Sequence, residues 1–288
     1  MTKQSFHHAR GEFEVASRPI LFGILNVTPD SFSDGGRFDS VERALSHATA
    51  MTAEGADVID VGGESTRPGA SEVAVDVEIS RVVPIVRELA RSGAIVSIDT
   101  RKAAVATAAL DAGAAIINDV SGLAFDPAMA RLVAERNAGV IIMHTRGTSA
   151  TMRDKTHYKA VIDDVLAELR VAVEHAIATG IRRRAIAVDP GIGFAKTASQ
   201  SLEIIGALER FLALGLPILV GPSRKSFIEH ITGKPADQRA FGTAAAVAIA
   251  VAKGASMIRV HDVAAMREVA LVAHAIATAT HDPASGAP

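Results

Sequence analysis

The sequence contains no cysteine and no tryptophan, and only one tyrosine among its 288 residues. Without cysteine the chain has no zinc–thiolate site, no iron–sulfur cluster, no disulfide and no cysteine nucleophile. Phenylalanine, at 10 residues, is almost the only aromatic type. The core must therefore consist mainly of Ala, Val, Ile and Leu, a composition that suits sheets covered on both faces by helices.

An excess of charge is also lacking. The 30 Lys and Arg residues against 32 Asp and Glu give a formal charge of −2, and no run of five like charges occurs. This balance argues against nucleic acid or an anionic membrane as the main partner. The longest stretch of small apolar residues, 244–252, is far shorter than the ~20 residues that cross a bilayer. Because residues 1–19 also lack the apolar core of a signal peptide, we predict no membrane span and a cytoplasmic protein.

Short apolar runs alternate with helical patterns along most of the chain. The eight runs lie at residues 21–27, 56–62, 94–100, 114–120, 139–145, 185–191, 217–223 and 256–262. Patterns with helical spacing, such as 40–55 and 163–180, occupy the longer gaps between them. Continuous β-branched runs that alternate with helices indicate parallel strands buried on both faces.

Eight such units predict an α/β protein with one domain, the (β/α)8 TIM barrel, with a doubly wound open sheet as the alternative. Nearly every run ends in polar residues, namely Asn26, Asp60, Asp99, Asn118, His144, Asp189, Ser223, Arg259 and His261. Strand ends converge at the mouth of a barrel, whereas an open sheet collects its ligand groups near one switch point, so these residues favour the barrel. We expect an N-terminal extension over 1–19, the barrel over 20–278 and a disordered tail over 279–288.

Two glycine-rich connections are longer than a turn between strand and helix requires. They span residues 28–36 after the first run and 62–69 after the second. Long polar loops with glycine hinges suggest lids over an active site. The alternative is that either loop is an ordinary surface connection.

Asp99, Asn118 and Asp189 end three different runs. If the faces that carry them point inward, the three side chains meet at the barrel mouth. Carboxylates beside an amide suit the donor and acceptor edge of an aminopyrimidinone ring, because the acids accept from ring N–H and exocyclic NH2 groups. Each aspartate taken alone is also typical of a helix cap.

Basic residues near the last two runs suggest an anion site. The hexapeptide 221–226 closes the seventh run and opens a helical pattern, so backbone N–H groups with Arg224 and Lys225 would bind an anion. The alternative is a plain Ser223 cap beside two solvated cations. Arg259 and His261 share one strand face and would hold a phosphate or pyrophosphate, with Arg67 added from the second loop.

A metal site made of protein side chains alone has little support in the sequence. Mg2+ held mainly by ligand phosphates is compatible, because it needs only one or two side chains. The remaining histidines look like surface or helix residues and receive no role; they include His7, His8, His47, His175, His230 and His274.

Several motifs together resemble the dihydropteroate synthase family of the folate pathway. The most specific are NVTPDSFSDGG, GGESTRPG and RVHDV, in this order, and the resemblance covers about residues 20 to 265. It implies a (β/α)8 barrel, usually a homodimer, and a target of sulfonamides. It also implies condensation of p-aminobenzoate with 7,8-dihydropterin-CH2-pyrophosphate, with Mg2+, to give dihydropteroate and pyrophosphate.

The resemblance further implies roles for individual residues. The pterin set is Asp99, Asn118, Asp189 and Lys225, in a pocket lined by Val120, Ile141, Met143 and Gly221. Asn26 would bind Mg2+, and the pyrophosphate grip would be Thr66, Arg67, Arg259 and His261. The p-aminobenzoate site would be Pro68, Phe194, Lys225 and Ser226. Asp34 would lie near the reacting methylene and amine, so the catalytic group would be Asp34, Arg67, Asp99 and Lys225.

Three other interpretations remain open from the sequence. Lys225 at a strand end is also typical of a Schiff-base aldolase, if its pKa is lowered. A pterin-dependent corrinoid methyltransferase shares the pterin-binding acids but lacks the two long loops. A paralogue that binds pterin without turnover is the third alternative, and the presence of Asn26, Asp34 and Arg67 argues against it.

Overall fold

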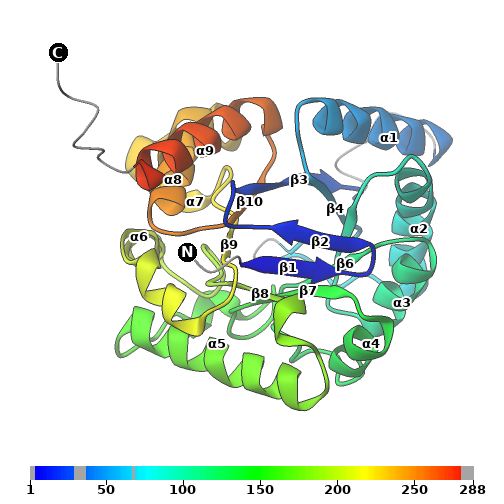
Figure 1. Ribbon diagram of the computed structural model, residues 1–288, viewed down its shortest axis with the longest axis horizontal. Coiled ribbons are helices and arrows are strands. Elements are labelled where there is room, and N and C mark those ends of the chain that lie inside the picture. The colour runs from blue at the N-terminus through cyan, green and yellow to red at the C-terminus, as the bar shows by residue number, and fades with distance from the viewer. Residues whose placement is uncertain (1–3, 29–36, 67–68, 280–288) are drawn as a thin grey trace.

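The computed structural model describes residues 4–28, 37–66 and 69–279, and eight parallel strands form its centre (Figure 1). They are β3 (Ile20–Asn26), β4 (Val58–Gly62), β5 (Val96–Asp99), β6 (Ile116–Asp119), β7 (Gly139–Met143), β8 (Ile186–Asp189), β9 (Leu219–Val220) and β10 (Met257–Val260). Each lies within or one residue outside one of the eight predicted runs. The strands neighbour one another in the order β8-β7-β6-β5-β4-β3-β10-β9. A bridge between Val188 and Ile218 joins the two end strands, so the predicted barrel is confirmed and the open sheet is wrong.

Helices surround the strands on the outside (Figure 1). They are α1 (Arg37–Ala53), α2 (Val75–Arg91), α3 (Ala103–Asp111), α4 (Met129–Arg136), α5 (Val161–Ala178), α6 (Ala198–Gly206), α7 (Ser226–Thr232), α8 (Ala240–Ala252) and α9 (Val263–Thr278). Short 3-10 turns add η2 (Met152–Lys155), η3 (Arg183–Ala185), η4 (Leu208–Leu214) and η5 (Ala236–Gln238). No helix in the described part of the chain combines the length and apolar character needed to cross a membrane.

The period of two along each strand divides the core into an inner and an outer part. On β3, Phe22 belongs to the inner cluster, whereas Leu21 and Leu25 pack outward against the helices. The inner cluster occupies the amino halves of the strands. Polar residues take over the same inward face at the carboxyl halves, for example Asn118 two residues after Ile116. The alternation thus places the functional groups in the barrel mouth without exposing the core.

The amino end of the barrel is closed by a hairpin that the sequence did not reveal. Strands β1 (Ser5–His8) and β2 (Gly11–Glu14) pair antiparallel and lie across the barrel (Figure 1). Phe6 is fully buried in the inner cluster, and the backbone N–H of Ala9 donates to the carbonyl of Ala115. The expectation that His8 is a surface or helix residue is wrong, because it is buried in β1. Burial, with the charges of Arg10 and His7, lowers the pKa of His8 to about 4.

Candidate active site

A partly buried arginine links three strands in the barrel mouth. Arg259 of β10 donates from Nε to Asp60 at 2.5 Å and from a terminal nitrogen to Asp99 at 2.7 Å. Asn118 of β6 also donates to Asp60, at 3.1 Å. Asp60 is completely buried. In the sequence Asp60 stands out only as a polar strand end, whereas in the structure it accepts from both Arg259 and Asn118 and so orients them.

Some acceptor atoms in this mouth have no partner in the described structure. They are one carboxylate oxygen each of Asp60 and Asp99, and the hydroxyl of Ser97, all buried. A buried acceptor without a hydrogen bond costs about 1–3 kcal/mol. A protein tolerates such groups where a ligand completes them, so a ligand rich in N–H donors is the natural occupant.

The electrostatics of the mouth follow mainly from burial. Burial raises the pKa of Asp99 to about 7, although Arg259 opposes the shift, and Asp60 adds to it. Burial likewise raises the pKa of Asp189 to about 6. The backbone N–H of Gly191, which donates to this carboxylate at 2.7 Å, opposes the shift. Burial and Arg259 lower the pKa of Lys225 to about 8. The mouth therefore holds acids and a lysine that change protonation near neutral pH, which is common at functional sites.

Lys225 and Phe194 meet at the side of the mouth formed by β8 and β9. The Lys225 ammonium lies 4.1 Å from the centre of the Phe194 ring, within the range of a cation–π contact. Ser226 follows as the exposed first residue of α7. Phe194, Thr66 and Val120 also line a cavity of about 260 Å³, with Arg101 among its other wall residues. The structure thus brings residues predicted for both substrates to one opening.

The predicted anion site around residues 221–226 differs from expectation. Arg224 pairs with Asp262 at 2.5 Å, so its charge is already compensated. Ser223 does not cap α7, because its hydroxyl contacts Nδ1 of His261 at 2.9 Å and accepts from the His261 backbone N–H at 3.2 Å. Burial and Arg259 lower the pKa of His261 to about 4. A neutral ring that accepts from Ser223 at Nδ1 carries its proton on Nε2, where it can donate to an anion.

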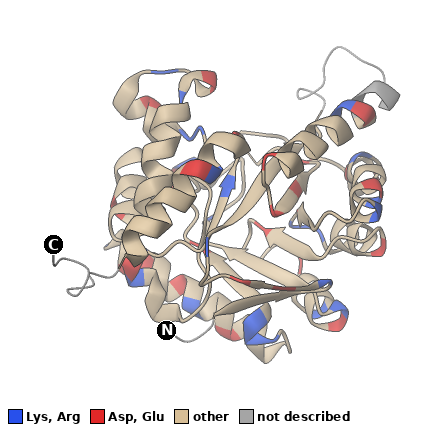
Figure 2. Cartoon of the chain, turned by 45° about the horizontal axis from the view of Figure 1, so that its top comes forward, with Lys and Arg blue, Asp and Glu red and all other residues tan. Residues whose placement is uncertain are grey.

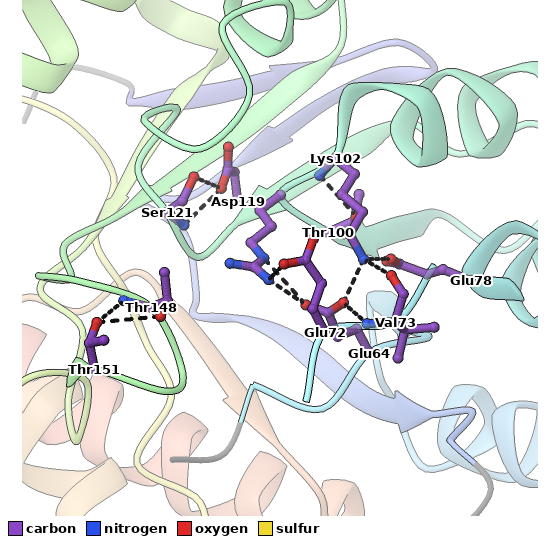
Figure 3. A network of polar contacts seen from close by, with 11 residues as sticks. Glu64, Glu72, Val73, Glu78, Thr100, Lys102, Asp119, Ser121, Thr148 and Thr151 are labelled. Atoms are coloured by element: carbon purple, nitrogen blue, oxygen red, sulfur yellow. Dashed lines mark hydrogen bonds and ion pairs between the residues drawn. The ribbon is translucent and has the colours of Figure 1, made fainter. Parts of the chain in front are cut away.

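A buried lysine closes the base of the second long loop (Figure 3). Lys102 donates from Nζ to Glu64 at 2.5 Å, to the carbonyl of Val73 at 2.6 Å and to Glu78 at 2.7 Å. Glu64 also accepts from the backbone N–H of Val73 at 2.8 Å, so residues 64 and 73 are held together. Lys102 does not stand out in the sequence, because nothing in a single sequence links it to residues 38 and 29 positions away.

The structure places the remaining predicted residues on or next to the strands. Ile141 and Met143 are buried on β7, Gly221 follows β9, and Asn26 ends β3. A Cβ placed on Gly62 would lie 3.7 Å from the Asn26 side-chain oxygen and 3.5 Å from Asp99 Cβ, so Gly62 leaves space between them. Asp34, Arg67 and Pro68 lie outside the described residues, as does most of the predicted tail, 280–288.

No group of three or more His, Asp or Glu side chains that could hold a metal occurs within residues 4–28, 37–66 and 69–279. The side-chain oxygen of Asn26 at the mouth is a suitable ligand for a hard cation that takes most of its other oxygen ligands from a substrate.

Known proteins are similar to this chain in sequence and in structure over most of its length. A family model described as pterin binding enzyme matches residues 22–261. The chain is 44% identical over 261 residues to dihydropteroate synthase of Bacillus subtilis (strain 168), covering 90% of this chain and 89% of that protein. Among solved structures, the Xanthomonas albilineans dihydropteroate synthase with 4-aminobenzoic acid gives a TM-score of 0.90 at 39% identity, covering 97% and 100% of the two chains. The Yersinia pestis dihydropteroate synthase with a sulfonamide drug gives 0.90 at 38%, covering 96% and 100%.

Proposed function

The chain belongs to the pterin binding enzyme family and is, like its dihydropteroate synthase relatives, a transferase of folate biosynthesis, and from this premise we propose how its barrel mouth works. The reaction joins the amine of p-aminobenzoate to the methylene of 7,8-dihydropterin-CH2-pyrophosphate and releases pyrophosphate. The single observation that carries the proposed site is the Asp60–Arg259–Asp99 arrangement, in which one buried oxygen of each aspartate has no partner in the described structure.

The pterin ring binds deepest, against the inner strand ends. Asp99 and Asp189 accept from ring N–H and NH2 groups, Asn118 serves either role, and Lys225 donates to a ring oxygen or nitrogen. Val120, Ile141, Met143 and Gly221 form the walls. The open oxygen of Asp99 supports this assignment, because an N–H donor would satisfy it.

The pyrophosphate lies nearer to β10 and β3, where positive charge and donors gather. His261 donates from Nε2, and Thr66, Arg67 and Arg259 complete the grip. Asn26 would provide the protein oxygen for Mg2+, which, when bound, would neutralise charge on the departing pyrophosphate. Phe194 and Pro68 would hold the p-aminobenzoate ring, with Lys225 and Ser226 beside its polar end.

These residues divide the work of breaking the C–O bond. When pyrophosphate leaves, the pterin methylene gains positive charge that the ring shares, so Asp99 and Asp189 stabilise the cation electrostatically. Arg67, Arg259 and His261 stabilise the anion. The amine of p-aminobenzoate then forms the C–N bond near Asp34 and loses one proton, which leaves with the released pyrophosphate or passes to solvent. Exclusion of water from the buried mouth prevents hydrolysis of the cation.

We also infer a homodimer, from the outer faces of α8 and α9. Phe241 and Ile249 of α8 and Val272 and Ile276 of α9 are large apolar residues that remain exposed, Phe241 by 86%. Figure 2 shows few charged residues on the helices near the C-terminus, and α8 has none. A patch of this kind is typical of a protein interface. Light scattering should give twice the monomer mass of 29.9 kDa, and Phe241→Asp should reduce it to the monomer mass.

Release of pyrophosphate tests the proposed reaction. It should require both substrates and Mg2+, and a sulfonamide should compete with p-aminobenzoate. Pyrophosphate release without p-aminobenzoate would contradict the condensation. Borohydride trapping of a carbonyl substrate on Lys225 would instead favour the aldolase alternative.

A further inference from the structure

The connection between β8 and α6, residues 190–197, carries Phe194 in an unusual backbone conformation. Gly191, Gly193 and Ala195 have φ values of +72°, +78° and +49°. Glycine adopts the left-handed region freely, but the Cβ of Ala195 makes it unfavourable there. A Cβ on Gly191 would lie 1.9 Å from the carbonyl oxygen of His144, so this loop is pressed against the end of β7. Such a conformation persists only where neighbouring groups hold it.

One such group is Lys196, which is only 8% exposed. Its Nζ donates to the carbonyl of Phe194 at 3.0 Å and contacts Nδ1 of His144 at 2.9 Å. Nε2 of His144 lies 3.0 Å from Glu168 on α5. Burial and Lys196 lower the pKa of His144 to about 4, so the neutral ring accepts from Lys196 and donates to Glu168. A chain of hydrogen bonds thus runs from α5 to the backbone of Phe194.

A second group is Tyr158, the only tyrosine of the chain. Its hydroxyl donates to the carbonyl of Ala195 at 3.0 Å, and the Arg146 guanidinium lies 4.0 Å from its ring centre. Nearby, Gln200 donates to the carbonyl of Thr156 at 2.9 Å. Gln200 also forms a capping box at the start of α6. Two consecutive carbonyls, those of residues 194 and 195, are therefore each held by a side chain.

We propose that Tyr158 and Lys196 are positioning residues for p-aminobenzoate, because they fix the backbone that presents the Phe194 ring to the mouth. This inference rests on the proposed function of Phe194. Their contacts with the loop are hydrogen bonds to the backbone carbonyls of residues 194 and 195, so they would act through the backbone. The strained loop would otherwise relax at residues 194 and 195 and move the ring. Asp99 and Asn118, on β5 and β6, would stay in place, and Asp189 is held by the backbone N–H of Gly191, before the part of the loop that Tyr158 and Lys196 fix.

Tyr158→Phe is the sharpest test, because it removes one hydroxyl and keeps the ring under Arg146. The KM for p-aminobenzoate should rise by about five- to tenfold, the size of one hydrogen bond. The kcat at saturating p-aminobenzoate and the dissociation constant of a pterin analogue should each change by less than about twofold. Lys196→Met should act in the same direction and more strongly, because it leaves the His144 and Phe194 acceptors without a donor.

Matched controls are Thr179→Ala, which removes an exposed hydroxyl bonded to the carbonyl of His175 at 2.9 Å, and Lys159→Met, which removes an exposed cation beside Tyr158. Both should leave all constants unchanged. An unchanged KM for p-aminobenzoate in Tyr158→Phe, or an equal loss of pterin binding, would overturn the proposal.

Amide hydrogen exchange separates this proposal from the proposed reaction. In Tyr158→Phe, exchange of residues 193–197 should accelerate while the rest of the barrel stays protected. If the wild-type protein released no pyrophosphate, the reaction would be wrong, and faster exchange would still support the positioning role. If exchange of these residues stayed at the wild-type rate, the positioning role would be wrong whatever the activity.

Discussion

The two ends of this barrel are made from the same strands and yet differ in almost every physical property. At the amino end, Phe6, Ile20, Phe22 and Met257 pack into a buried apolar cluster. At the carboxyl end, two residues beyond apolar positions of β4, β8 and β10, lie Asp60, Asp189 and Arg259, and one buried oxygen each of Asp60 and Asp99 has no partner in the described structure. The inward face of one strand can thus change from apolar to charged along its length. The apolar end contributes to the stability of the barrel, and the charged end carries the groups for binding and catalysis.

The largest effect is expected at the closed end. Phe6→Ala should lower the free energy of unfolding by about 3–5 kcal/mol, because Phe6 is fully buried and its loss leaves a cavity. Denaturant titration measures the loss. Pterin affinity of the folded fraction should remain at the wild-type value. A large fall in that affinity with little loss of stability would contradict the division between the two ends.

The opposite pattern is expected in the mouth. Asp99→Asn should weaken pterin binding by about 1.5–3 kcal/mol, because a charged hydrogen bond to the ligand is lost. Stability should change less, since the buried carboxylate is itself partly unsatisfied. Calorimetry with a pterin analogue measures the affinity. Asp111→Asn, at an exposed pair with Arg136, is the control and should leave pterin binding unchanged.

The two ends should also respond to pH in opposite directions. His8 has its pKa lowered to about 4, so between pH 4 and 6.5 the unfolded chain binds more protons and acid destabilises the hairpin end. Asp99 has its pKa raised to about 7, so between pH 3.8 and 7 the folded chain binds more protons and stability falls as pH rises. Each slope is at most about 1.4 kcal/mol per pH unit.

Variants at the two positions should expose these slopes. The wild-type protein should gain stability through His8 as the pH rises, and His8→Gln should abolish this gain. It should lose stability through Asp99 as the pH rises, and Asp99→Asn should abolish this loss. Thermal unfolding measured from pH 4 to 7 decides the matter. Identical pH profiles for wild type and both variants would show that neither group is linked to folding.

The smallest effect is expected at the rim of the mouth. Glu72 is 58% exposed on its side chain and lies 3.5 Å from Arg101, outside the buried Glu64–Lys102 contact. Glu72→Gln should change stability by less than about 0.5 kcal/mol, as exposed ion pairs do. Glu64→Gln in parallel should cost several times more, because Lys102 then loses a buried partner. Equal losses in the two variants would remove the distinction between rim and interior.

The sequence predicts the barrel well because its signal is local. Each apolar run carries its own length, β-branched composition and polar end, so all eight strands could be placed. The hairpin was missed because β1 and β2 have four residues each and few apolar side chains. Its burial depends on Phe6 reaching a barrel interior that only the folded chain creates.

The candidate site was predictable in its residue types and less so in its pairings. Strand-end position indicates that Asp60, Asp99 and Arg259 share the mouth. It cannot indicate that one guanidinium joins both acids, because these residues are 199 and 160 positions apart from Arg259. Arg224 is a second example. The basic residues around it predicted an anion site, but in the structure its charge is paired with Asp262. Pairing is a property of tertiary structure, and a single sequence does not contain it.

The bridge between Val188 and Ile218 has a mechanical consequence. Strand β9 has only two residues, so the closure between β8 and β9 is the seam of the barrel. The proposed pterin partners Asp189 and Lys225 lie on opposite sides of this seam. A bound pterin would therefore link the two sides of the seam. The backbone amide of Val188 donates to the carbonyl of Pro217 across the seam at 2.9 Å. Its hydrogen exchange should be slower with pterin bound than in the empty barrel.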